Sequence, residues 1–348
     1  MAVTRSAAAA PAVALLAALT GASCAAASPA APDPPPGLRA TPAGALAALP
    51  PDTWPTLTPP RPAGGGFRLL ALGDTGEPGP DMDKVTRAVR ATPADAVIVL
   101  GDLVYEHAPA CPPAGPGPDE RAIFDAQIAN AVGDPRRPVY LAIGNHDVAW
   151  SRDPDYGLRA RELCYVAWAA GREDVVMPGV TYAVDLGAAV MVVVDSNHLD
   201  AEQAAFARAT WAAHPDARRI LAAHHVLRTF RDKEGQDLLR PWLVAHDLKP
   251  ELVLSGHAHI LQFGIYDGLP AVTSGATSRV RPRAPCPGRC GAGERFGQST
   301  PGFAVISVAA DGQLGVAFED TAGRTLFAWT EPPRAPLGPD EEGWFDDW

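Results

Sequence analysis

Five short apolar runs in this sequence each end in a cluster of Gly, Asp, Asn or His residues, and this pattern constrains the fold more than any other feature. The clusters are Gly73-Asp74-Thr75-Gly76, Gly101-Asp102-Leu103-Val104-Tyr105, Gly144-Asn145-His146-Asp147, His224-His225 and Gly256-His257-Ala258-His259. In an open α/β sheet, ligands bind outside the carboxyl ends of the strands. We therefore expect the five clusters to meet at one rim of a sheet.

The apolar runs alternate with segments of helical periodicity, which indicates an α/β fold. The pattern predicts strands at 67–72, 96–100, 139–143, 190–194, 220–223 and 252–254, and helices near 81–91, 120–132, 158–170, 201–213 and 235–245. After His259 the helical segments cease, and the pattern predicts strands at 261–266, 270–273, 303–308, 314–319 and 325–329. We expect α+β character in this β-rich C-terminal part.

The charge balance argues against a nucleic-acid partner. The chain has a formal net charge of -11 and a sequence pI of about 5.2, without a long run of Lys or Arg. One segment, 278–298, is an irregular insertion that carries five arginines: Arg279, Arg281, Arg283, Arg289 and Arg295. Such a segment is either a solvated loop or a rim that attracts anions.

The N-terminus predicts export. Arg5 precedes an apolar core at 7–19, which is typical of a signal peptide. The run Thr20-Gly21-Ala22-Ser23-Cys24 resembles a bacterial lipobox, although Gly21 stands where Leu is usual, so we expect a lipoprotein of the cell envelope with a lipid at Cys24. The alternative is secretion after cleavage at Ala27. The predicted organisation is a signal peptide at 1–24, a Pro/Ala-rich flexible linker at 25–62, one domain at 63–330 and an acidic tail at 331–348.

Four further cysteines can pair in an oxidising compartment. We favour one disulfide between Cys286 and Cys290 and another between Cys111 and Cys164, although four cysteines allow three connectivities. Their spacing matches no CxxC zinc pattern, which makes a structural zinc site improbable.

The residue types in the five clusters indicate a metal site. Taken singly, Asp74 or Asp102 is an ordinary turn or capping residue, and Tyr105 is an ordinary packed aromatic. Together on one rim, Asp, Asn and His side chains are better explained as metal ligands. The ordered set resembles the calcineurin-like metallophosphoesterase family, whose pattern is D…GD…GNH[DE]…H…GHxH, and the resemblance extends from Asp74 to His259.

Two blocks connect the sequence with one subclass of that family. The commonest first block is DxH, whereas Gly76 stands here at the position of that histidine. The second block, GDLVY, is similar to the GDxxY form of purple acid phosphatases, including the tartrate-resistant type, in which the tyrosine is a ligand. The resemblance also implies a two-layered β-sandwich flanked by helices.

Carried over by position, the resemblance implies a role for each site residue. It assigns Asp74, Tyr105 and His259 to one metal, Asn145, His224 and His257 to a second metal, and Asp102 to both. His146 is expected to donate a hydrogen bond or a proton to the substrate, and Asp147 is expected to help hold His146. His224 is preferred over His225 because it fits the apolar-x-x-His spacing of the family, and His225 receives no role.

The expected function is that of an exported acid phosphatase. A phenolate is a hard donor that favours Fe(III), while neutral Asn and His donors suit a divalent ion such as Fe, Zn or Mn. The resemblance implies that a metal-bound hydroxide attacks a small phosphomonoester substrate. The alternatives are a phosphodiesterase of the same family and a non-catalytic metal-binding surface lipoprotein.

Overall fold

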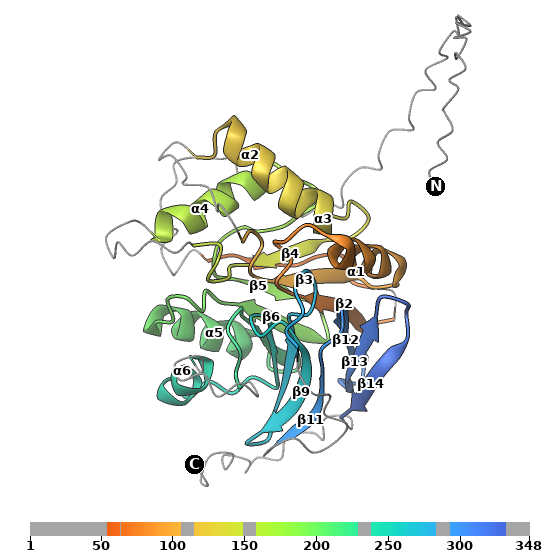
Figure 1. Ribbon diagram of the computed structural model, residues 1–348. Coiled ribbons are helices and arrows are strands. Elements are labelled where there is room, and N and C mark those ends of the chain that lie inside the picture. Colours follow the sequence, from red (N-terminus) through yellow and green to blue (C-terminus); the bar gives the residue numbers. More distant parts are fainter. Residues whose placement is uncertain are drawn as a thin grey trace, which may run out of the picture. The chain divides into compact units, whose positions relative to one another are not determined.

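The computed structural model describes residues 54–62, 64–105, 115–148, 158–228, 238–282 and 293–331. In this part of the chain the strands form two sheets (Figure 1). The six-stranded sheet has the order β14 (Thr325–Thr330), β13 (Leu314–Asp320), β12 (Gly302–Val308), β2 (Phe67–Leu72), β3 (Ala96–Leu100) and β4 (Val139–Ala142). The eight-stranded sheet has the order β1 (Thr56–Leu57), β5 (Tyr182–Asp185), β6 (Ala189–Val193), β7 (Arg218–Ala222), β8 (Leu252–Ser255), β10 (Leu269–Ser274), β9 (Leu261–Tyr266) and β11 (Glu294–Gln298).

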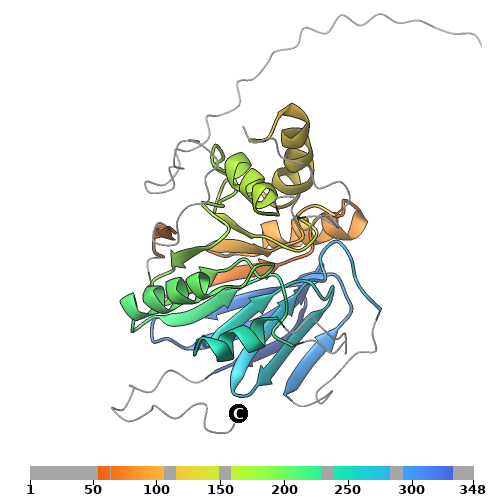
Figure 2. The same cartoon turned by 90° about the vertical axis from the view of Figure 1, so that its left-hand side faces the viewer.

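The two sheets pack face to face (Figure 2). Alternate strand residues fill the core between them. Leu69 and Ile98 enter this core from the six-stranded sheet, and Met191 and Ile220 enter it from the other sheet. The intervening residues face outward and are buried beneath helices. Burial on both faces explains why the strands are continuous apolar runs instead of alternating ones.

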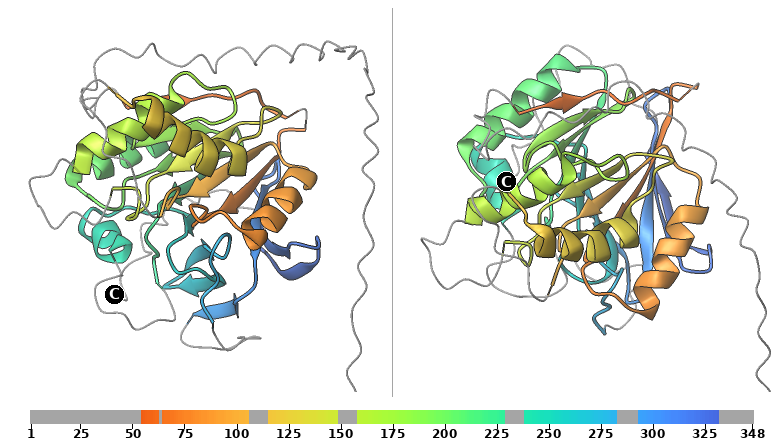
Figure 3. Two further views of the ribbon diagram at one scale, coloured as in Figure 1. Left: turned by 45° about the horizontal axis from the view of Figure 1, so that its top comes forward. Right: turned by 90° about the horizontal axis from the view of Figure 1, so that it is seen from above.

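Helices cover the outer face of each sheet. The six-stranded sheet packs against α1 (Pro80–Ala91), α2 (Pro118–Phe124), α3 (Asn130–Val132) and α4 (Leu158–Ala169), of which α2 and α4 lie side by side (Figure 3). The eight-stranded sheet packs against α5 (Ala201–Ala213) and α6 (Leu239–Ala245). A π-helical turn, Asp125–Ala129, separates α2 from α3. No helix in the described part is long and apolar enough to cross a membrane.

The architecture confirms the predicted two-layered fold with flanking helices, but three strands were not expected. Two of them, β1 and β5, are short, and β1 extends the fold into the predicted 25–62 linker, where Trp54 is buried. The third, β11, lies in the segment that we expected to be irregular. The register of its pairing with β9 shifts between Glu294 and Phe296. Buried and exposed residues therefore do not alternate regularly along β11, and the sequence lacks the pattern that predicts a strand.

Several predicted features lie outside the described residues. They are the signal peptide with its Cys24 lipobox, most of the linker, residues 332–348 of the tail, and Cys111, Cys286 and Cys290. Cys164 is buried and disulfide-bonded. Of the predicted helix near 235–245, the described residues contain α6, and positions 235–237 lie outside them.

Truncation of a side chain between the two sheets tests this architecture. Ile98 is fully buried there, so Ile98→Ala should lower the free energy of unfolding by about 2–5 kcal/mol through lost burial and a residual cavity. Val244 on α6 is 52% exposed, and Val244→Ala should change the free energy of unfolding by less than about 0.5 kcal/mol. Urea unfolding measures both values. Equal values for the two variants would contradict the described core.

Candidate metal centre

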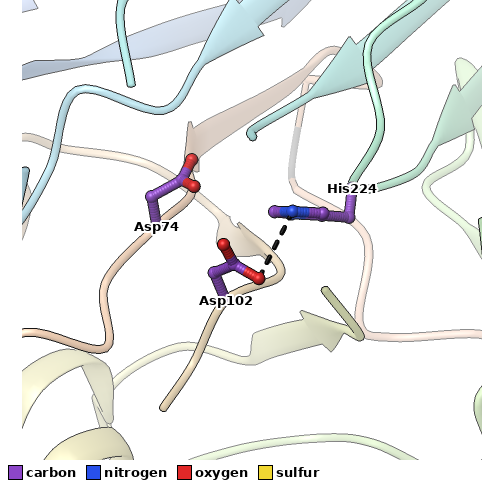
Figure 4. A group of neighbouring side chains, drawn as sticks. All are labelled: Asp74, Asp102 and His224. Carbon is purple, nitrogen blue, oxygen red and sulfur yellow. Dashed lines mark ion pairs between the residues drawn. The ribbon is translucent and has the colours of Figure 1, made fainter. Parts of the chain in front are cut away.

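The structure brings all five polar clusters together beyond the carboxyl ends of strands from both sheets. Strands β2, β3 and β4 run parallel to one another, as do β7 and β8. Each of these strands leads directly into one of the clusters. In Figure 4, Asp74, Asp102 and His224 point toward one another from three different chain segments. One potential ligand atom from each of these three residues lies within 4.8 Å of the other two.

The first group of donor atoms consists of Asp74, Tyr105 and His259. The Tyr105 hydroxyl donates to Asp74 Oδ1 at 3.0 Å and lies 3.3 Å from His259 Nε2. His259 Nε2 is 3.4 Å from the same Asp74 oxygen. All three side chains are buried or nearly so. This is the set that the sequence assigned to one metal.

The second group consists of Asn145, His224 and His257, with Asp102 beside it. His224 Nε2 lies 3.0 Å from Asn145 Oδ1, 3.1 Å from His257 Nδ1 and 3.3 Å from Asp102 Oδ1. The dashed line in Figure 4 marks the contact with Asp102. This is the set that the sequence assigned to the second metal.

The tautomer of His224 follows from the contact of its Nδ1 atom. Nδ1 lies 2.8 Å from the carbonyl oxygen of Leu100, which only accepts, so Nδ1 carries the proton. Nε2 therefore presents a lone pair to Asn145 Oδ1 and Asp102 Oδ1, which are acceptors as well. A backbone carbonyl behind a histidine is the usual device for orienting a metal ligand. This convergence of acceptors fits a cation.

Burial keeps the imidazoles of the site neutral. It lowers the pKa of His224 well below its ordinary value, and burial together with His224 lowers the pKa of His257 to about 2. Burial and the charge of Arg281 lower the pKa of His259 to about 4. Neutral imidazoles at neutral pH are the form that binds metals.

The acidic groups respond to burial in the opposite sense. Burial and the neighbouring Asp102 raise the pKa of Asp74 well above its ordinary value. Burial and Asp74 also raise the pKa of the Tyr105 hydroxyl. Without a cation Tyr105 is thus a phenol, and deprotonation to a phenolate requires positive charge at this position.

Four of the donor residues have left-handed backbones: Asp74 (φ 59°), Asp102 (φ 53°), His257 (φ 65°) and His259 (φ 55°). Such a conformation costs a non-glycine residue about 1–3 kcal/mol and persists where the surroundings enforce it. These backbones turn the four side chains inward at the ends of the strands. The strain is concentrated at the candidate site.

Two glycines permit the close approach of the loops. A Cβ at Gly144 would collide with the backbone nitrogen and Oδ1 of Asp102. A Cβ at Gly76 would lie 2.7 Å from Val104 N, so this position has no space for the histidine of the commonest DxH block. The hydroxyl of Tyr105 instead reaches the first donor group.

The contacts of Asp147 organise two loops. Its Oδ1 accepts hydrogen bonds from the backbone nitrogens of Leu103 (2.8 Å) and Val104 (3.0 Å) and from the Tyr165 hydroxyl (3.2 Å). Its Oδ2 accepts a hydrogen bond from Gly144 N at 2.7 Å. Although these hydrogen bonds favour the carboxylate, burial and Asp102 raise the pKa of Asp147 to about 8. These contacts join the second and third clusters, and the expected role of Asp147 in holding His146 stays a prediction.

His146 and His225 lie beside the donor groups. The backbone nitrogen of His146 donates to Asp102 Oδ1 at 2.9 Å, and its ring packs edge-on against Tyr105 with centroids 4.8 Å apart. His225 Nδ1 lies 2.9 Å from the Ser196 hydroxyl, and its ring lies 4.8 Å from that of His257. Nδ1 of His225 is thus engaged by Ser196, whereas Nε2 of His224 faces Asn145 and Asp102.

The sequence analysis missed a sixth cluster, which follows β10. Ser278 Oγ donates to the carbonyl oxygen of Asp74, and a Cβ at Gly275 would collide with the Asp74 carboxylate. The signal was present as Ser-Gly-Ala-Thr-Ser directly after an apolar run. Because β10 runs parallel to β8, its carboxyl end reaches the same rim.

Comparisons with known proteins agree with this geometry. The profile of the calcineurin-like phosphoesterase family matches residues 67–261, which is more than half of the chain. No curated protein matches the sequence.

Solved structures share the fold at low identity. GAP50, described as the anchor in the inner membrane complex of Plasmodium, has 14% identity and a TM-score of 0.59, with 78% of this chain and 90% of that chain covered. The purple acid phosphatase PPD1 of yellow lupin (Lupinus luteus) has 17% identity and a TM-score of 0.55, with 78% of this chain and 55% of that chain covered. PhoD has 12% identity and a TM-score of 0.51, with 78% and 74% covered.

Thermal denaturation with added metal tests the candidate centre. Zn²⁺ or Mn²⁺ should stabilise metal-free protein by about 2.7 kcal/mol at 100 times Kd, because the ion binds the folded state. His224→Ala should lose most of this gain, since it removes the convergent Nε2. His225→Ala should retain it and serves as the matched control. The reverse pattern would assign the ligand role to His225.

Proposed function

The chain belongs to the calcineurin-like phosphoesterase family, and from this premise we propose that it is an exported phosphatase with two metal ions that hydrolyses phosphomonoesters. Within the family we propose the purple acid phosphatase subclass. The observation that carries the proposal is the pair of donor groups on either side of Asp102, one of which contains the Tyr105 hydroxyl. A carboxylate between two cations supplies an oxygen to each.

The proposed ligands divide into an anionic and a neutral set. Asp74, Tyr105 and His259 would hold the first ion, and Asn145, His224 and His257 would hold the second, with Asp102 shared. When bound, the two ions would acidify water and neutralise charge on the phosphoryl group. The neutral second set leaves its cation electrophilic, which suits a divalent Fe, Zn or Mn ion.

The identity of the first ion is argued from Tyr105. Burial and Asp74 oppose ionisation of its hydroxyl, so a highly charged cation is needed to stabilise the phenolate. A phenolate oxygen is a hard donor, and hard donors favour hard cations. We therefore propose Fe(III) at this position.

The remaining residues would act on the substrate. Asp102 holds the backbone of His146, which orients this residue beside both donor groups. We propose that the His146 side chain donates a proton to the oxygen of the departing alcohol, a step for which a positioned imidazole is suited. We propose that Asp147 contributes by fixing the backbone of Gly144 and of the loop that carries Tyr105.

Two alternative functions are separable by experiment. A phosphodiesterase would use the same donor groups. A non-catalytic metal-binding protein is the second alternative, and the description of GAP50 as an anchor gives a reason to test it. Export, with a lipid anchor at Cys24 or as a secreted protein, stays a prediction from the sequence.

Substrate preference tests the proposed reaction. Protein that is stripped and reloaded with iron and zinc should hydrolyse p-nitrophenyl phosphate with a higher kcat/KM than bis(p-nitrophenyl) phosphate, because a site with net positive charge favours the dianion. Release of p-nitrophenol measures both reactions. Preference for the diester would support the phosphodiesterase. Two bound metals without turnover of either compound would support the non-catalytic alternative.

The colour of the protein tests the role of Tyr105. Charge transfer from a phenolate to Fe(III) should give a broad visible absorption band and a purple or pink solution. Tyr105→Phe should abolish the band, weaken iron retention and shift the activity optimum to higher pH, because the remaining ions acidify water less. Absorption spectroscopy with metal analysis measures these effects. Active, colourless wild-type protein that holds two divalent ions would exclude the purple subclass and leave the family assignment intact.

A further inference from the structure

The segment 275–281, which follows β10, is attached to the backbone of two donor residues. Ser278 N and Ser278 Oγ both donate to the carbonyl oxygen of Asp74, the former at 3.2 Å. Arg281 N donates to the carbonyl oxygen of His259 at 3.0 Å. Between these two attachment points lie Val280 and, next to Ser278, Arg279. Its backbone position is therefore tied to the first donor group.

The side chain of Arg279 extends over the site. Its guanidinium carbon lies 4.7 Å from the centroid of the Tyr105 ring, and Nε forms an ion pair with Glu77. Glu77 is held in turn, because its backbone nitrogen donates to Ser278 Oγ at 3.3 Å. The Arg279 side chain is 42% exposed, so it lies at the boundary between the buried donor atoms and solvent.

This position brings a permanent positive charge near the place where a substrate would bind. The Arg279 guanidinium lies over the Tyr105 ring, and the His146 ring packs against the same ring at an interplanar angle of 63°, so both groups contact one aromatic side chain. A guanidinium stays protonated at all relevant pH values and presents several donors in a fixed plane. The ion pair between Glu77 and Arg279 Nε partly neutralises the charge of the guanidinium and also orients the side chain.

We propose that Arg279 is a specificity-determining residue that favours phosphomonoesters over phosphodiesters by interacting with the second negative charge of the monoester dianion. This inference rests on the proposed function of the same site. A diester carries a single charge and has an ester group in place of the additional anionic oxygen. It therefore gains less from a guanidinium at the rim. Of the two alternatives for the segment 278–298, this role of Arg279 favours the rim that attracts anions.

Kinetics with both substrates test the proposal. In metal-loaded protein, Arg279→Gln should lower kcat/KM for p-nitrophenyl phosphate by about 10–100-fold, mainly through KM, as expected for a lost charged hydrogen bond. The value for bis(p-nitrophenyl) phosphate should change by less than about threefold. Arg279→Lys should restore part of the loss because it keeps the charge. Arg240→Gln is the matched control, since Arg240 on α6 is 46% exposed and pairs with Asp267.

A binding measurement keeps this inference separate from the proposed reaction. Calorimetry should show that Arg279→Gln binds inorganic phosphate about tenfold or more weakly than wild type at unchanged metal content. This result would support the interaction of Arg279 with a phosphate dianion even if wild type hydrolyses neither ester, an outcome that would overturn the proposed function. An equal loss for both esters, unchanged phosphate affinity, absence of phosphate binding by wild type, or loss of metal in Arg279→Gln would each overturn the role assigned to Arg279.

Discussion

The juxtaposition of Asp74 and Asp102 is the constraint on which the rest of the site depends. Both carboxyl groups are buried, and the charge of Asp102 helps to raise the pKa of Asp74. Two like charges in a medium of low dielectric repel strongly unless a cation lies between or beside them. The surrounding neutral imidazoles, among which His224 turns its Nε2 lone pair inward, add donors without adding charge. The arrangement is unfavourable for a protein alone and favourable for one that binds metal.

The scaffold holds these groups in place at a cost. Four donor residues have left-handed backbones, and the loops approach so closely that Gly144 has no space for a Cβ beside Asp102. Such strain persists only where the surrounding structure enforces it. The two-sheet core fixes the strand ends, and Asp147 joins two of the loops through backbone hydrogen bonds. Rigid strands and strained loops therefore position the site together.

The sequence predicted the strands that are buried on both faces, because their continuous apolar runs are distinctive. It also predicted that the five polar clusters meet at one rim, since their order along the chain is informative even though each residue alone is not. It missed β1, β5 and β11, which are short or bulged. It also missed the contacts of Ser278 with Asp74 and of Arg279 with Tyr105, because these depend on a tertiary approach between segments more than 170 residues apart in the sequence. The role expected of Asp147 toward His146 stays a prediction, since spacing does not reveal the direction of a side chain.

Anomalous diffraction from crystals of the iron- and zinc-loaded protein would test the central claim most directly. Data collected at the two absorption edges should show two peaks on opposite sides of the Asp102 carboxylate. The iron peak should lie among Asp74, Tyr105 and His259, and the zinc peak among Asn145, His224 and His257. A single peak, or peaks that do not share Asp102, would contradict the account of a centre built around that carboxylate.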